Sequence, residues 1–319
     1  MWGGYFFLPF LFLVLVNIAD GRHSDLSNAI SLAFVFFFIL LQGSIHVFAA
    51  CSLYVCLFFL FNLRFVRVLL LALPAILVLN FFRLFPAAIT FRGLDDPFLS
   101  GYPTILDVIR AFLVIERPSM EMIAGLSSAL YWWEVDVFVG FIAFCFLVYF
   151  GVYRSWNQEN ARLRFSAFNL PNIVMAVFAL NNIYYVIAKL PIPFAGVERI
   201  PSRFLILPVI ALLMIATVRL DDALRDRLNL RSAHLIALFC LAQTYLELMT
   251  HLRHWNVAAI DTLLPSTSEI SIYTVQVADD LFYVTSVKVS FLISAIGFLV
   301  CAALYLWSRR NRGTVVTPP

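Results

Sequence analysis

A line of polar and ionisable side chains lies inside a long apolar run in the C-terminal third of the chain. Gln243, Glu247 and His251 recur every four residues, and His254 follows three residues later. Side chains four residues apart share one face of an α-helix, so the spacing predicts a polar membrane stripe. A carboxylate inside an apolar helix is costly to bury and therefore marks a candidate site for proton transfer. Packing against a neighbouring helix is the structural alternative.

Three other carboxylates are candidates for acid–base chemistry. Asp95 and Asp96 precede a proline, a position suited to a turn or to carboxylates that hold a metal-bound phosphate substrate. Glu134 lies two residues before Asp136, where helical geometry points the two side chains apart, so helix capping competes with a catalytic role. A divalent cation is the one cofactor that this pattern suggests. The sequence does not show which carboxylate would be the catalytic base: Asp95, Asp96, Glu134 or Glu247.

A charged segment, residues 193–208, separates two apolar runs. Glu198, Arg199 and Arg203 lie close together in it. Guanidinium groups bind phosphate through paired hydrogen bonds, so Arg199 and Arg203 are candidate ligands of a lipid phosphate or pyrophosphate. The alternative is that Glu198 and Arg199 form an ion pair while Arg203 reaches the lipid headgroups.

Membrane helices are the elements that must position these side chains. The 319 residues are 62% hydrophobic and 13% charged, which a soluble domain cannot cover with polar surface. Apolar runs long enough to cross the roughly 30 Å hydrocarbon layer recur along the whole chain. We expect an all-α integral membrane protein, a single transmembrane domain over residues 1–319 formed by a polytopic bundle of about nine helices. The expected spans are about 3–19, 27–42, 46–62, 67–83, 134–152, 169–188, 204–219, 234–250 and 290–307.

The distribution of charge predicts how these spans are threaded. Short cytoplasmic loops carry an excess of Lys and Arg. With the N-terminus outside, 13 basic and 6 acidic residues fall on the cytoplasmic side, against 9 basic and 13 acidic residues on the other side. We therefore predict that the N-terminus is outside and the C-terminus is cytoplasmic. The turn Gln42-Gly-Ser-Ile-His46 is short. The alternative is one span plus a re-entrant piece over residues 27–62, which places the N-terminus inside and gives eight spans.

Three longer segments are expected outside the membrane, about 84–133, 190–203 and 251–289. In the first, Thr104–Glu116 has apolar residues at helical spacing, which predicts a short amphipathic helix at the outer interface. The third mixes Ser, Thr, Val and Tyr in 266–289 and is expected to be extended or irregular. No basic tract interleaved with aromatics and no phosphate-binding loop occurs, so nucleic-acid binding and ATP-driven transport lack support.

Several short motifs resemble one family. They are Gly196-Val-Glu-Arg-Ile-Pro-Ser-Arg-Phe204, Glu134-Val-Asp-Val-Phe-Val-Gly140, Gly3-Gly4 with Pro9, and Gln42-Gly-Ser-Ile-His46. These segments are similar to the later membrane half of large bacterial GT-C-type glycosyltransferase-like proteins, over about residues 3–220. The resemblance implies a polytopic enzyme of the bacterial inner membrane that transfers a sugar from a polyprenyl-phosphate donor on the outer side.

The chain departs from this family in one respect. The acidic catalytic motif of such enzymes lies in a first large external loop, and no position of this sequence matches it. We therefore expect the chain to correspond to the later part of a longer or split protein.

Two other functions are consistent with the sequence. One is a non-catalytic membrane subunit or scaffold that binds lipid or partner helices. The other is an O-antigen polymerase-like protein, in which Arg199, Arg203, His251 and His254 would serve as its external Arg and His residues. The expected partners are membrane lipids, a polyprenyl-phosphate sugar and a membrane protein.

Overall fold

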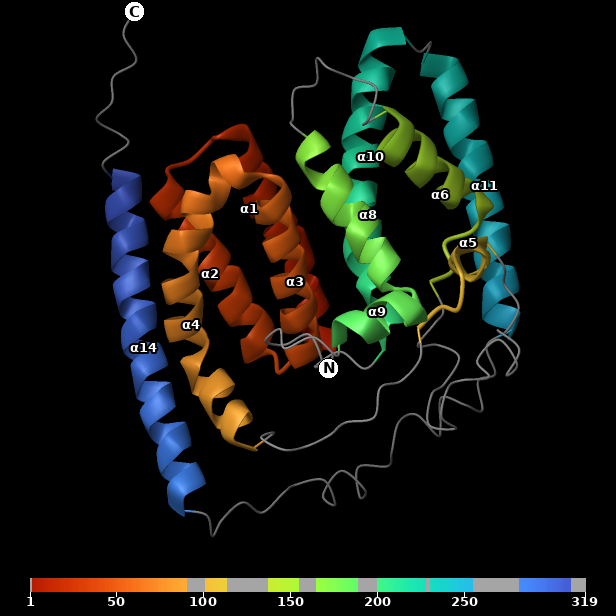
Figure 1. Ribbon diagram of the computed structural model, residues 1–319. Coiled ribbons are helices and arrows are strands. Elements are labelled where there is room, and N and C mark those ends of the chain that lie inside the picture. Colours follow the sequence, from red (N-terminus) through yellow and green to blue (C-terminus); the bar gives the residue numbers. More distant parts are fainter. Residues whose placement is uncertain are drawn as a thin grey trace, which may run out of the picture. The chain divides into compact units, whose positions relative to one another are not determined.

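The described part of the chain is helical. The computed structural model describes residues 2–90, 101–113, 137–154, 165–188, 200–227 and 230–310, apart from 255–280 (Figure 1). The predicted all-α class is confirmed in these ranges, where the β-type pairing is an isolated bridge between Tyr102 and Leu180.

Among the described residues, four helices are long and apolar enough to cross a membrane: Gly3–Asp20, Leu63–Ile89, Pro201–Asp222 and Leu281–Ser308. The other predicted spans overlap shorter apolar helices, which are Asp25–Leu41, Ile45–Phe61, Phe141–Tyr153, Phe165–Phe178 and Ala237–Met249. The described residues are therefore compatible with a membrane location.

The chain divides into two compact units. Unit 1 comprises residues 1–96, 160–174 and 278–319, and unit 2 comprises residues 97–159 and 175–277. The elements of unit 1 are η1 (Trp2–Phe7), α1 (Leu8–Asp20), α2 (Asp25–Leu41), α3 (Ile45–Phe61), η2 (Leu63–Phe65), α4 (Val66–Thr90), η5 (Phe165–Phe168), the start of α8 (Asn169–Phe178) and α14 (Leu281–Arg310).

Local signals explain where the first helices of unit 1 begin and end. Gly21, with φ of 67°, follows the last residue of α1, and the Ser24 side chain accepts a hydrogen bond from the Ser27 N–H at the start of α2. Gly43, with φ of 77°, lies in the turn between α2 and α3. These are two separate helices of 17 residues each, so the predicted turn at residues 42–46 is confirmed.

Contacts between distant residues define the two ends of unit 1. At one end Ser24 and Ser308 share a hydrogen bond of 3.1 Å between their hydroxyls, and Arg67 lies 3.9 Å from the Asp25 carboxylate. At the other end the Gly4 N–H donates to the Ser44 hydroxyl at 3.1 Å. Arg67 and the start of α2 thus share an end, as the predicted threading requires.

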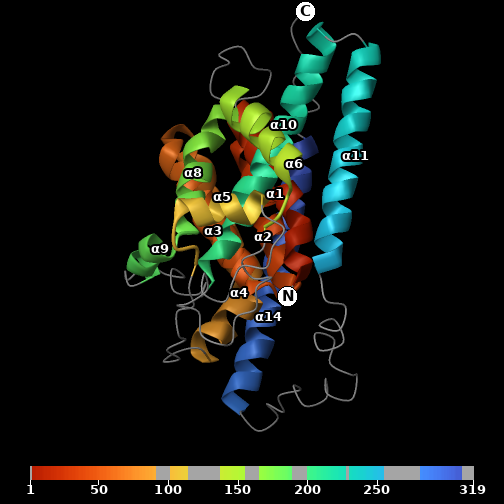
Figure 2. The same cartoon turned by 90° about the vertical axis from the view of Figure 1, so that its right-hand side faces the viewer.

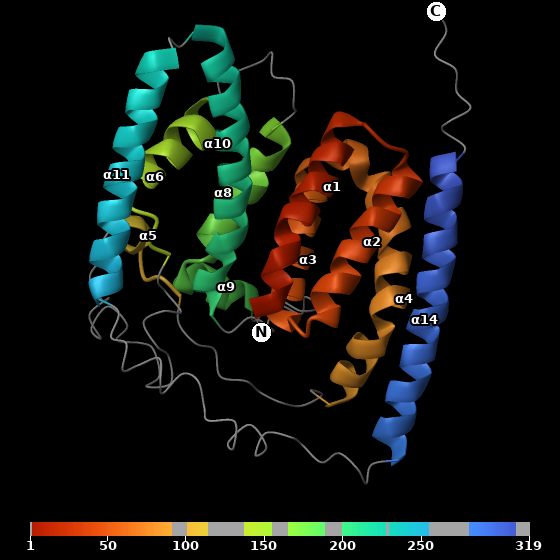
Figure 3. The same ribbon diagram turned by 180° about the vertical axis from the view of Figure 1, so that it is seen from behind.

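A serine-lined face of α14 packs on α4, and the two helices lie beside α2 (Figure 3). The Ser294 hydroxyl accepts from the Phe82 N–H at 2.8 Å and donates to the Val78 carbonyl at 3.1 Å, and so bridges two groups that would bond each other in a regular helix. Pro86 has no N–H for the Phe82 carbonyl, and the Ser290 hydroxyl, which donates to the Val287 carbonyl of its own helix at 3.0 Å, also lies 3.4 Å from the Phe82 carbonyl. A neighbouring helix therefore satisfies backbone groups that lipid would leave unpaired.

Unit 2 is less regular. Its elements are α5 (Ile105–Leu113), α6 (Phe141–Phe146), the π-helical segment η4 (Leu147–Tyr153), the end of α8, α9 (Asn181–Ala188), η6 (Pro201–Leu205), α10 (Ile206–Arg227) and α11 (Leu230–His254). The long helices α10 and α11 are visible in Figure 2. The predicted helix within 104–116 is confirmed as α5, whose Phe112 is buried in the core of this unit with Tyr102, Ala179, Leu180 and Leu205.

Three predicted boundaries are wrong. The predicted fifth span, 134–152, has non-helical backbone at residues 137–140, and its helix begins at Phe141. The predicted sixth span, 169–188, is broken between α8 and α9. Residues 281–289, expected to be extended or irregular, form the first turns of α14.

The break between α8 and α9 has a physical cause in another segment. The Tyr102 N–H donates to the Ala179 carbonyl at 3.1 Å, and the Asn181 N–H donates to the Tyr102 carbonyl at 2.9 Å. A Cβ at Gly101 would lie 2.6 Å from both the Ala179 carbonyl oxygen and Cγ of Pro201, so only glycine permits this approach. The helix α8 therefore ends next to residues 179–181, whose backbone groups hydrogen-bond to Tyr102.

Candidate functional site

Two of the four residues of the polar stripe predicted on α11 are hydrogen-bonded to each other. Nε2 of Gln243 donates to Oε1 of Glu247 at 3.2 Å, so these two side chains share a face of the helix. Both side chains are partly buried. His251 and His254 lie on the same helix, but their side chains are outside the described part of the structure.

Glu247 packs against an unusual glycine in unit 2. Gly140 has φ of 84° and ψ of 162°, a conformation that essentially only glycine adopts. A Cβ at this position would collide with Oε2 of Glu247. Position 140 therefore requires glycine for two reasons: its backbone conformation, and the Glu247 carboxylate that occupies the place of a Cβ.

The backbone beneath Glu247 is fixed by hydrogen bonds to α5. The N–H groups of Val139 and Gly140 both donate to the Phe112 carbonyl at 3.2 Å. The Gly140 carbonyl accepts from the Phe144 N–H at 2.9 Å, which begins α6. The end of α5, the start of α6 and the middle of α11 thus meet at one carboxylate.

The other described carboxylates of unit 2 include two with structural roles. Asp107 caps α5, because its carboxylate accepts from the Thr104 N–H at 3.0 Å and from the Thr104 hydroxyl at 2.7 Å. Asp222 lies 3.8 Å from the Arg219 guanidinium on the same helix. The Gln243 amide that donates to Glu247 is neutral, like the Thr104 groups that donate to Asp107, so it orients the carboxylate without neutralising it.

Arg203 lies on η6, close to the break between α8 and α9. Its neighbour Pro201 contacts Gly101, and the Gly101 N–H lies 3.5 Å from Oδ1 of Asn181. Arg203 already takes part in an interaction within the protein. Its predicted role as a phosphate ligand therefore stays a prediction.

Several predicted site residues lie outside the described ranges: Asp95, Asp96, Glu134 and Arg199. Within the described ranges, no group of three His, Cys, Asp or Glu side chains is placed to hold a metal ion. Of the four predicted catalytic carboxylates, only Glu247 lies within the described ranges.

Sequence reasoning missed two positions of this site. Gly140 was noted only as the end of a motif, because a glycine in a sequence does not reveal its φ angle or its neighbours. Gly101 lies in a Ser-Gly-Tyr-Pro turn signal, but residues 179–180 contain neither Gly nor Pro to mark the helix break. No family model, characterised protein or solved structure is detectably similar to the chain.

Proposed function

We propose that the chain is a multi-pass membrane protein of the glycosyltransferase-like class that acts on a polyprenyl-phosphate-linked sugar. In this proposal it has nine spans in the bacterial inner membrane, the N-terminus is outside and the C-terminus is cytoplasmic. The observation that supports it best is the Glu247 carboxylate, oriented by Gln243 and seated on Gly140, whose backbone conformation is essentially restricted to glycine. Backbone in sparsely populated conformations is often found at functional sites.

Glu247 would act as the general base in sugar transfer. Its carboxylate would take the proton of an acceptor hydroxyl as the hydroxyl oxygen bonds to the anomeric carbon of the donor. The bond between that carbon and the phosphate oxygen breaks, and its electron pair leaves with the polyprenyl phosphate. Partial burial raises the strength of such interactions relative to bulk water.

The negative charge on the departing phosphate needs a cation. Arg203 and Arg199 are the candidates from the sequence, since guanidinium groups bind phosphate bidentately. Asp95 and Asp96 are candidates to hold a divalent cation in the same role. We assign no step to a metal.

A second function, a non-catalytic subunit that binds lipid or partner helices, is favoured by the surface of α11. Leu238, Phe239, Leu241, Tyr245 and Leu246 are all exposed on this helix, each by more than half. Lipid alone satisfies such a surface in a bilayer, whereas a subunit would cover it with another apolar helix.

Replacing Glu247 with Gln tests the enzyme proposal. The amide has the same shape and can still accept from Gln243, but it cannot take a proton at neutral pH. With the full chain in nanodiscs and a panel of polyprenyl-phosphate sugars, we expect turnover to fall at least about 100-fold while donor binding is retained. Thr217→Ala, an exposed change on α10, is the matched control and should leave turnover unchanged.

The possible results separate the two functions. Equal turnover by the wild type and E247Q would refute a catalytic role of Glu247. If no donor is bound or turned over and the chain instead copurifies with a second membrane protein, the subunit proposal is favoured.

A further inference from the structure

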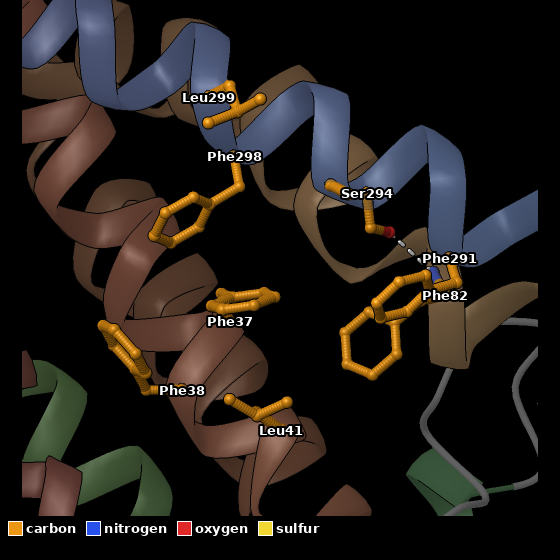
Figure 4. Close-up of a pocket in the computed structure, with 9 residues that line it drawn as sticks. Phe37, Phe38, Leu41, Phe82, Phe291, Ser294, Phe298 and Leu299 are labelled. Atoms are coloured by element: carbon orange, nitrogen blue, oxygen red, sulfur yellow. Dashed lines mark hydrogen bonds between the residues drawn. The ribbon is translucent and has the colours of Figure 1, made fainter.

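An apolar groove of about 400 Å³ lies on unit 1 between α2, α4 and α14 (Figure 4). The aromatic and aliphatic side chains that line it include Phe37, Phe38, Leu41, Phe82, Phe291 and Phe298. The hydroxyl of Ser294 also lines the groove, but it is already bonded to Phe82 and Val78 of α4. The groove therefore offers an apolar surface of a size typical of ligand sites.

The rim of this groove is exposed. Phe291 and Leu299 are 65% and 68% exposed. Both α4 and α14 are long enough to span a membrane, so a hydrocarbon chain is the natural occupant of a groove between them. Lipid chains are as apolar as these side chains, and selection among lipids must therefore come from the headgroup.

Two cations lie at one end of the groove. Arg83 follows Phe82, and its Nη2 atom lies 3.5 Å from the position of a Cβ on Gly43, two residues after Leu41. Lys288 lies three residues before Phe291, on the face of α14 that lines the groove. Both side chains are exposed.

The carboxylates of unit 1 lie elsewhere. Among the residues that the structure describes in this unit, the carboxylates are Asp20 and Asp25. Both are at the opposite end, where Asp20 pairs with Arg22 at 3.0 Å and Asp25 lies near Arg67. The described ion pairs do not include Arg83 or Lys288.

We propose that this groove binds an anionic phospholipid, with an acyl chain along Phe37 and Phe298 and the phosphate held by Arg83 and Lys288. The aromatic rings would pack against the acyl chain, and the two cations would favour a negatively charged headgroup. Each cation near an anionic membrane surface contributes enough binding free energy for about a fivefold change in affinity. This site lies in unit 1 and does not depend on the function proposed for Glu247.

Lipid binding to the full chain in detergent micelles, followed by native mass spectrometry, tests this site. The probes are phosphatidylglycerol and phosphatidylcholine. We expect the wild type to prefer phosphatidylglycerol, R83Q or K288Q to lower that affinity about fivefold, and the double variant to lower it about 25-fold. Arg67→Gln removes the same charge from the opposite end of unit 1, where Arg67 is 82% exposed, and should change the affinity less than about twofold.

A second variant tests the groove itself. Ala295 is exposed and lines the groove, so A295W should fill it and abolish the preference for phosphatidylglycerol without removing a charge. The proposal is overturned if the double variant keeps the wild-type preference, or if polyprenyl phosphate displaces phosphatidylglycerol at much lower concentration. It is also overturned if A295W leaves lipid binding unchanged and instead converts a dimer into a monomer, because a second copy of the chain is then the occupant.

Discussion

In unit 1 several polar side chains hydrogen-bond to other helices, whereas in unit 2 the Glu247 carboxylate lies against Gly140, in a backbone conformation that essentially only glycine adopts. The Tyr54 hydroxyl donates to Oδ1 of Asn172 at 2.7 Å, and Nδ2 of Asn62 donates to the Ala167 carbonyl at 3.0 Å. These bonds, like those of Ser294, tie helices of unit 1 together. The described hydrogen bond of the Glu247 carboxylate comes instead from an amide of its own helix, and the carboxylate packs against Gly140.

A buried polar group that completes a helix–helix contact is explained by stability alone. The Glu247 carboxylate, seated on a glycine-only backbone conformation, is not explained in this way, and the proposed role as a general base would account for it. Three substitutions, taken from the largest expected effect to the smallest, test this contrast.

Gly140→Ala should have the largest effect. It forces a non-glycine residue into a conformation that costs about 1–3 kcal/mol, and it displaces the Glu247 carboxylate. We expect a loss of about 3 kcal/mol in the free energy of unfolding, measured in mixed micelles, together with loss of turnover. Gly21→Ala is the control, because Gly21 also has a positive φ but a Cβ there meets nothing within 4 Å. If both variants behave alike, backbone strain alone explains the site and the contact with Glu247 is unimportant.

Ser294→Ala should have an intermediate effect in unit 1. It leaves the Phe82 N–H and the Val78 carbonyl without their shared partner in an apolar environment. We expect a loss of about 1–2 kcal/mol in the free energy of unfolding, with turnover unchanged. Ser52→Ala is the control, because the Ser52 hydroxyl bonds only to the Phe48 carbonyl of its own helix. An equal loss in both variants would show that the bridge between α4 and α14 adds nothing.

Gly4→Ala should have the smallest of the three effects. A Cβ on Gly4 would lie 2.6 Å from Cβ of Ser44, so the turn between α2 and α3 must move, at a cost of about 1 kcal/mol. Gly3→Ala is the matched comparison, because its Cβ meets the flexible end of Gln42 at 2.9 Å and should cost less than about 0.5 kcal/mol. Thermal unfolding of the two variants side by side checks the order, and a larger loss for Gly3→Ala would contradict the described packing.

The sequence allowed the regular parts of this fold to be predicted. The polar stripe at Gln243 and Glu247, the turn at residues 42–46 and the helix after Thr104 depend on local spacing, and local spacing is visible in a sequence. The break at Ala179–Leu180 was not predictable, because it depends on hydrogen bonds to Tyr102, which is 77 residues away. The place of Glu247 on Gly140 was equally hidden, since it depends on the packing of α11 against α6.

We propose that Glu247 in unit 2 acts as a general base, whereas Ser294 in unit 1 holds two helices together. The most direct test is to measure sugar-transfer rate and unfolding free energy for E247Q and S294A side by side. The account predicts that E247Q loses at least about 100-fold in rate at near-normal stability, and that S294A loses stability at a normal rate. A normal rate for E247Q in a folded chain that transfers sugar would contradict it.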